Sequence, residues 1–309
     1  MFIKVLTQVT ILFILIGVGF ILTKAKLLSP KGVTSMTDLV LYTVTPCVIV
    51  KSFVREFNRD ILKQLLCSFA LAFLTHLIFI LLCKILFPGG SVDKHRVLCF
   101  AAIFSNCGFM SLPLQQAILG DDGVLFCATY IATFNIITWS YGILLISGDR
   151  KFITPKKLIL NPGLISVAIG LILFITQLPL PTIISEPIGY LAALNTPVPM
   201  VIIGHHLANS SFKNILGDRS ALFTIFLRLV AFPLVILALL FAFKIEKTLA
   251  ISLVISASAP VAALSTMFAA KFNPKPQLIE LSVGVVSFST VLSIITMPLI
   301  ITLAQTIIK

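Results

Sequence analysis

Long apolar runs and short polar connections alternate along the whole chain. A membrane-spanning helix needs roughly 20 mostly apolar residues, and ten runs of about this length are present. They cover residues 5–23, 34–53, 63–87, 96–118, 123–147, 159–177, 183–208, 221–243, 249–270 and 280–305. The short connections leave no room for a soluble domain. The pattern therefore predicts an all-α polytopic membrane protein with ten transmembrane helices in one membrane domain.

Composition and charge add an orientation. Hydrophobic residues make up 58% of the 309 residues and charged residues 11%, against about 25% charged residues in soluble domains. The net charge of +12 comes from Lys and Arg at the ends of the apolar runs, so it does not indicate a nucleic-acid partner. These bases are more frequent in the loops that follow odd-numbered runs. Because basic loops tend to stay in the cytoplasm, we expect the protein to lie in the cell membrane (inner or plasma membrane) with both termini outside. The first run is expected to stay as an uncleaved helix.

Polar, proline-containing interruptions recur at corresponding places in the two halves. Run two contains TPCVIVKSF and run seven contains TPVPMVIIGHH. Run four contains SNCGFMSLPL and run nine contains SASAPVAALS. Because five helices precede the second half, it must enter the membrane in the opposite sense. The pattern predicts two inverted five-helix repeats, residues 1–150 and 151–309, which in secondary transporters enclose a substrate site near the midplane.

The interruptions in runs four and nine predict broken, crossing helices. A break inside the membrane frees backbone polar groups, which must then face protein, water or ligand. A half-helix N-terminus suits an anion, and the amide of Asn106 can both donate and accept hydrogen bonds. We expect Gly108, Pro113 and Pro260 to create the breaks. Asn106 is expected to orient the substrate, and Ser111, Ser256 and Ser258 are expected to line its site.

The residues around these breaks resemble a known family. NCGFMSLPL and the segment 257–283, ASAPVAALSTMFAAKFNPKPQLIELSV, are similar to the auxin efflux carrier family, which includes plant PIN-formed carriers and bacterial malate-permease-like proteins. In the family pattern Asn-x-x-x-x-Gly-x-Pro-Leu, Asn106, Pro113 and Leu114 match, while Ser111 replaces the glycine. The resemblance implies two inverted five-helix repeats, a scaffold part, a transport part that moves against it, and crossing helices 4 and 9 that frame the substrate. A homodimer is an expectation that rests on the resemblance alone.

Run two departs from the plant carriers, which have an Asn-Asn-Pro stretch there. This chain has TVTP instead. Asn195 and Thr196 of run seven are expected to line the site opposite Thr43 and Thr45, and Pro46 is a further expected site residue. The departure favours a small carboxylate, such as malate or another dicarboxylate, over auxin as the substrate.

Three ionisable residues inside the runs are candidates for coupling or charge compensation. His76 could carry a proton or pack as a neutral ring. Arg228 could offset substrate charge, although snorkelling to the interface is favoured. His205, next to His206, could line a cytoplasmic vestibule, although interface packing is favoured. The six cysteines lack metal-ligand spacing, so neither a metal nor another cofactor is expected.

These observations predict a secondary active transporter for a small organic anion that works by alternating access, coupled to H⁺ or Na⁺ or driven by the anion gradient. The acidic residues stay at the rims of the runs, so an enzyme is not expected. Two alternatives remain open: a sodium-coupled bile-acid-type symporter, and a membrane receptor or sensor that binds a small ligand without moving it. The expected partners are the anion and the lipid bilayer.

Overall fold

The computed structural model describes residues 2–87, 92–153, 160–210 and 212–308. Within these ranges every element is helical, as the apolar pattern predicts, and no strand is present. The α-helices are α1 (Phe2–Lys24), α2 (Pro30–Leu39), α3 (Thr45–Phe53), α4 (Arg59–Leu86), α5 (Val92–Ile103), α6 (Leu112–Ile137), α7 (Ile143–Ser147), α9 (Pro162–Thr176), α10 (Thr182–Ala193), α11 (Pro197–Ala208), α12 (Lys213–Leu216), α13 (Arg219–Phe226), α14 (Phe232–Ala242), α15 (Lys247–Ser258), α16 (Leu264–Phe272) and α17 (Pro276–Ile307). Short π-helical and 3₁₀ segments connect them: η1 (Val40–Val44), η2 (Cys107–Ser111), η3 (Thr138–Gly142), η4 (Arg150–Phe152) and η5 (Leu227–Ala231).

Seven of the described segments are long and apolar enough to cross a membrane, where the sequence predicts ten. The difference arises where helices are interrupted or short. The segment 107–147 counts once although Gly120 bends it with φ 67°, while α9 and α15 are apolar but shorter. Residue 159 of the predicted run 159–177 lies outside the described residues. The chain is a multi-pass helical membrane protein, and its ten-helix count and inverted repeat stay predictions.

Three π-helical turns precede prolines inside the apolar runs. The segments η1, η2 and η5 are each followed two residues later by Pro46, Pro113 and Pro233, respectively. Proline has no N–H and its ring crowds the carbonyl four residues earlier. A π turn moves the hydrogen bonds of neighbouring residues to the fifth carbonyl back, as the N–H of Leu112 does with Cys107. The helices therefore continue past these prolines, each through a widened turn.

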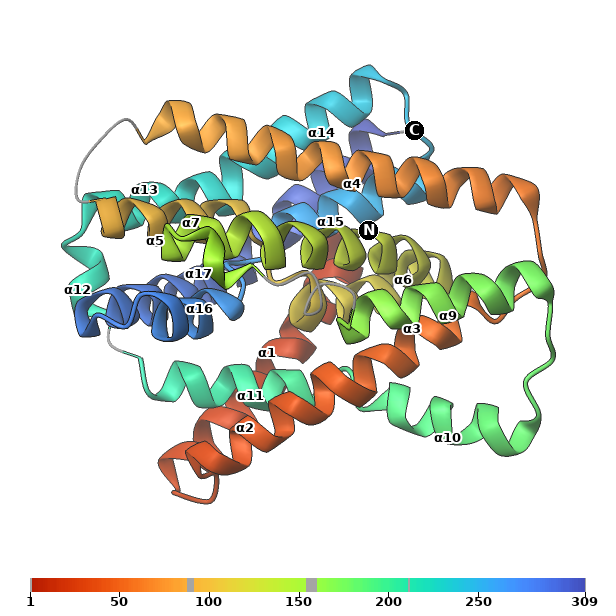
Figure 1. Cartoon of the computed structure of the whole chain (residues 1–309), viewed down its shortest axis with the longest axis horizontal. Helices are drawn as coiled ribbons and strands as arrows, with labels where there is room; N and C mark the ends of the chain where they lie inside the picture. Colours follow the sequence, from red (N-terminus) through yellow and green to blue (C-terminus); the bar gives the residue numbers. More distant parts are fainter. Residues whose placement is uncertain (1, 88–91, 154–159, 211, 309) are drawn as a thin grey trace.

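The helices divide into two groups according to their main packing partners. In the first group α1 packs on α11, and α3 packs on α9 and α10. In the second group α6 packs on α4 and α15, while α17 packs on α15 and α16. Figure 1 shows α2, α10 and α11 along the lower edge and α4, α13 and α14 along the upper edge. Much of the contact between the groups is apolar, because one buried cluster joins side chains of α1, α2 and α11 to those of η2, α15 and α17.

Candidate functional site

Two helix breaks face one another in the middle of the second group. Helix α5 ends at Ile103 before η2 begins at Cys107, and α15 ends at Ser258 before α16 begins at Leu264. Ser105 and Val261 form an antiparallel bridge between the two breaks. The N–H of Asn106 donates to Pro260 O at 2.7 Å, and the N–H of Ala262 donates to Phe104 O at 2.9 Å. The breaks therefore satisfy part of each other's backbone, as buried broken helices require.

The expected cause of the first break is wrong in part. Gly108 lies in the π turn η2 and is not among the residues with positive φ, so its conformational freedom is not what opens the helix. Pro113 lies in the first turn of α6, beyond the break. The interruption is at residues 104–106, where hydrogen bonds to the other broken helix replace helical ones. Pro260 does lie within the second break.

Asn106 begins the second half of its broken helix. Its Oδ1 accepts a hydrogen bond from the N–H of Phe109 at 3.3 Å, which is N-cap geometry. Among the described residues, its Nδ2 has no hydrogen-bond partner. A Cβ atom built on Gly108 would meet no atom within 4 Å, so open space lies beside this backbone. The Asn106 amide thus keeps a free donor at a helix N-terminus, where partial positive charge favours an anion.

On one side of the crossing, a polar network joins α6 to α15. It includes Gln115, which was not among the expected site residues. Gln115 Nε2 donates to Ser256 Oγ at 2.8 Å and to Ser111 Oγ at 3.0 Å, and Ser252 Oγ donates to Gln115 Oε1. All four side chains are buried. Ser111 and Ser256, which were expected to line a substrate site, instead hold two half-helices together.

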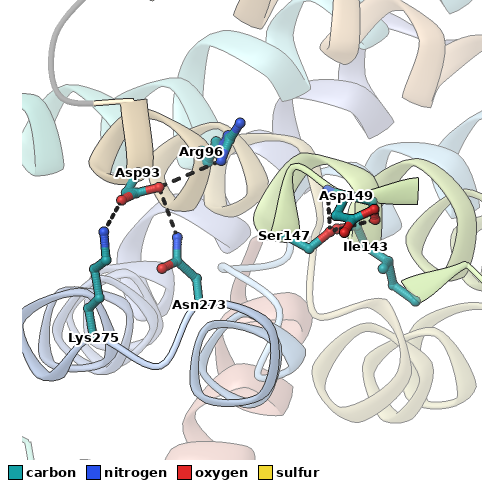
Figure 2. Close-up of polar contacts among 7 residues, drawn as sticks. All are labelled: Asp93, Arg96, Ile143, Ser147, Asp149, Asn273 and Lys275. Atoms are coloured by element: carbon teal, nitrogen blue, oxygen red, sulfur yellow. Dashed lines mark hydrogen bonds and ion pairs between the residues drawn. The ribbon is translucent and has the colours of Figure 1, made fainter. Parts of the chain in front are cut away.

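On the other side, an ion-pair cluster joins α5 to the turn after α16. Asp93 near the start of α5 accepts hydrogen bonds from Lys275 and from Asn273 Nδ2, the latter at 3.2 Å (Figure 2). These two contacts, with Arg96 at 3.6 Å, hold the pKa of the Asp93 carboxyl below its usual range. Each half of one broken helix is therefore fastened to a half of the other. In Figure 2 the Ser147–Asp149 turn that ends α7 forms a separate local cap.

A cavity of about 260 Å³ lies between the two helix groups. Three of the expected site residues line it: Pro113 from α6, and Asn195 and Thr196 from the turn between α10 and α11. The sequence analysis missed the remaining polar lining, which consists of Lys51, Ser52, Gln116 and Asp121. Asn106 does not line this cavity. It lies seven residues before Pro113, about 10 Å along the helix axis.

The snorkelling expected for Arg228 is wrong. Its side chain is 0% exposed, and its guanidinium Nη1 donates to Ala102 O at 3.1 Å and Ile103 O at 3.0 Å. Its Nη2 donates to Ala257 O. Arg228 therefore lies at the crossing itself and binds the carboxyl ends of both α5 and α15. The sequence around Arg228 is apolar on both sides, so it does not show whether the side chain is buried at a crossing or lies at the membrane interface.

The other expected residues lie apart from the cavity. His76 is buried on α4, where Nδ1 contacts Ala72 O at 2.8 Å and the ring lies 4.9 Å from that of Tyr130. His205 contacts Thr23 and Asn209, between α11 and α1. Ser258 donates to Ile255 O of its own helix at 3.1 Å. Thr45 is buried and Pro46 half-buried next to η1.

One exposed ion pair connects the two groups near the cavity. Arg55, after α3, contacts Asp122 at the bend of α6, with 2.5 Å between Nη1 and Oδ1. We expect Arg55→Asp to lower the melting temperature of the detergent-solubilised protein by about 2 °C, since it replaces attraction of at most about 1 kcal/mol by repulsion. The double exchange Arg55→Asp/Asp122→Arg should recover most of this loss. A double variant no more stable than Arg55→Asp would show that the pair contributes nothing.

Comparison with known proteins places the chain in a family. No curated protein sequence matches it significantly. A family model described as membrane transport protein matches residues 4–153 and 149–301, which together span nearly the whole chain. This match agrees with the resemblance of the segments around Asn106 and Pro260. The chain therefore belongs to the membrane transport protein family, the family of the auxin-efflux-like transporters.

Proposed function

We propose that this membrane transporter is a secondary carrier for a small organic anion, such as a mono- or dicarboxylate, and that it works by alternating access. The observation that carries the proposal is the crossing of two broken helices with an unpartnered side-chain donor, Asn106 Nδ2, at a helix N-terminus. The free amide donor of Asn106, with the open space beside Gly108, points to a carboxylate as the group recognised there. Neither break contains an acidic residue, as the sequences at 104–106 and 259–263 show.

The cavity between the two helix groups supports a route to the crossing. Lys51, Ser52 and Asn195 offer a positive charge and polar atoms to an entering anion. In our proposal the first group is the scaffold and the second group carries the crossing past it. The apolar contact between the groups favours such sliding, because it has few directional bonds to break. Proton coupling through His76 and assembly as a homodimer stay predictions.

Accumulation of labelled carboxylates in proteoliposomes, paired with thermal-shift binding on the same compounds, tests the proposal. A carrier accumulates or exchanges at least one carboxylate with saturation, and unlabelled compound of the same kind competes with the label. Binding without flux would contradict the proposal and support the receptor alternative. Flux that requires Na⁺ would support the sodium-coupled alternative.

Lys51 is expected to raise the local concentration of the anion at the cavity. Lys51→Gln should raise KM for the transported carboxylate about two- to fivefold, because an exposed charge contributes roughly 0.2–1 kcal/mol. The effect should shrink at high salt. Lys63→Gln is the matched control, since Lys63 is exposed on α4, pairs with Asp60 and does not line the cavity. Equal KM values for the two variants would remove Lys51 from the proposed entry route.

A further inference from the structure

Arg228 combines complete burial with a set of partners that lacks any carboxylate. Within the described part of the chain it forms no salt bridge. Its partners are three backbone carbonyls and the ring of Phe79, whose centroid lies 5.0 Å from the guanidinium carbon. A buried charge is costly unless it is compensated. The partial negative charges at two helix C-termini, about half an elementary charge each, together compensate one guanidinium.

The three carbonyls are free because the two breaks divert their helical donors. Ala102 O would accept from Asn106 N–H, which donates to Pro260 O instead. Ile103 O would accept from Cys107 N–H, which donates to Ser105 O. Ala257 O would accept from Val261 N–H, which donates to Ser289 Oγ. The crossing thus creates a cluster of three unpaired carbonyl oxygens, and one side chain from η5 fills it.

Such a cluster is a cation site. Unwound carbonyls and half-helix C-termini are the groups that coordinate coupling cations in secondary transporters. We propose that Arg228 is a tethered cation that occupies this site permanently, so that the carrier needs no Na⁺ to form its crossing. A guanidinium stays charged at neutral pH, and its planar fork reaches both half-helices at once. The consequence for transport rests on the proposed function, whereas occupation of the site does not.

Removing the guanidinium should turn the filled site into one that a free cation can enter. Two further unpartnered polar atoms belong to side chains that interact electrostatically with Arg228, namely Tyr130 OH and His76 Nε2. In Arg228→Ala, guanidinium or Na⁺ should therefore bind with saturation, while the wild-type protein should respond to neither. Arg228→Lys should be intermediate in stability, since one ammonium cannot reproduce the fork.

The test measures melting temperature in detergent while choline is exchanged for Na⁺, or guanidinium is added at low concentration. Arg228→Ala should show a saturable rise of a few degrees, while wild type and the exposed control Arg219→Ala show none. No saturable rise in Arg228→Ala, or a saturable Na⁺ response in wild type, would overturn the proposal. If Arg228→Ala does not fold, two measurements still test the proposal: the wild-type response to Na⁺, and the melting temperature of Arg228→Lys, which should lie below that of the wild-type protein. These melting temperatures do not depend on transport. The absence of carboxylate flux in proteoliposomes would therefore contradict only the proposed function.

Discussion

Asn106→Asp is expected to abolish saturable transport of the carboxylate while the protein stays folded. The substituted carboxylate keeps an oxygen where Oδ1 now accepts the hydrogen bond of Phe109 N–H, and Asp and Asn are equally good N-cap residues. It loses the Nδ2 donor and places a negative charge where the anion is proposed to bind. Like charges in contact cost several kcal/mol, so kcat/KM should fall on the order of a hundredfold or more.

Asn106→Ala provides the comparison that separates capping from recognition. It removes the cap as well as the amide, so stability should fall by about 0.5–2 kcal/mol in addition to the loss of transport. Asn106→Asp should melt close to wild type, and the two variants should both be inactive. Thermal melting and flux of both variants in the same preparation are the measurements. Wild-type flux through a folded Asn106→Asp protein would exclude Asn106 from the anion site.

Gly19→Ala is expected to destabilise the first helix group by at least about 1–3 kcal/mol, the range of overpacked cores. Helices α1 and α11 cross so closely that a Cβ on Gly19 would lie 2.3 Å from Val201 O, and a Cβ on Gly204 would lie 2.1 Å from Ile16 O. Both obstacles are backbone atoms, so no side-chain rotation relieves the clash. The apparent melting temperature of the detergent-solubilised protein measures the effect.

Gly17→Ala is the matched control, two residues earlier on the same helix. A Cβ there would meet no atom within 4 Å, and alanine is favoured over glycine in a helix by about 0.5–1 kcal/mol. Gly17→Ala should therefore melt at or slightly above the wild-type temperature. A Gly19→Ala protein as stable as Gly17→Ala would show that α1 and α11 are not packed backbone to backbone.

Much of the fold can be predicted from the sequence pattern, because a segment that crosses the bilayer must satisfy its own backbone hydrogen bonds and therefore forms a helix. The apolar runs predict helices, and the polar connection at 119–122 coincides with the bend at Gly120. The interruption around Pro260 is also where α15 stops. The break near Asn106 was placed too close to Pro113, because proline marks a crowded carbonyl and the π turn η2 absorbs that crowding. Proline position alone does not distinguish a bend from a break.

The site was less predictable, because its chemistry depends on contacts between distant segments. Asn195, Thr196 and Pro113 line the cavity, and their role in substrate binding stays a prediction. Lys51 and Gln116 resemble ordinary polar ends of apolar runs. Buried Gln115 gave a usable signal, since an amide inside a membrane helix usually bonds to another helix. Arg228 gave none, because its partners are carbonyls that exist only once α5 and α15 have both ended. Backbone carbonyl partners cannot be predicted from the pattern of side chains along the sequence.

Transport of a carboxylate at the helix crossing is decided by substrate-driven current in proteoliposomes that contain wild-type or Asn106→Asp protein. The current is recorded with Na⁺ and again with choline. We expect a saturable current for at least one carboxylate in wild type, the same current in choline, and none in Asn106→Asp. Tracer exchange on the same vesicles covers transport without net charge movement. Specific binding of the carboxylate to wild type without current or exchange, or equal transport by the Asn106→Asp protein, would contradict this expectation.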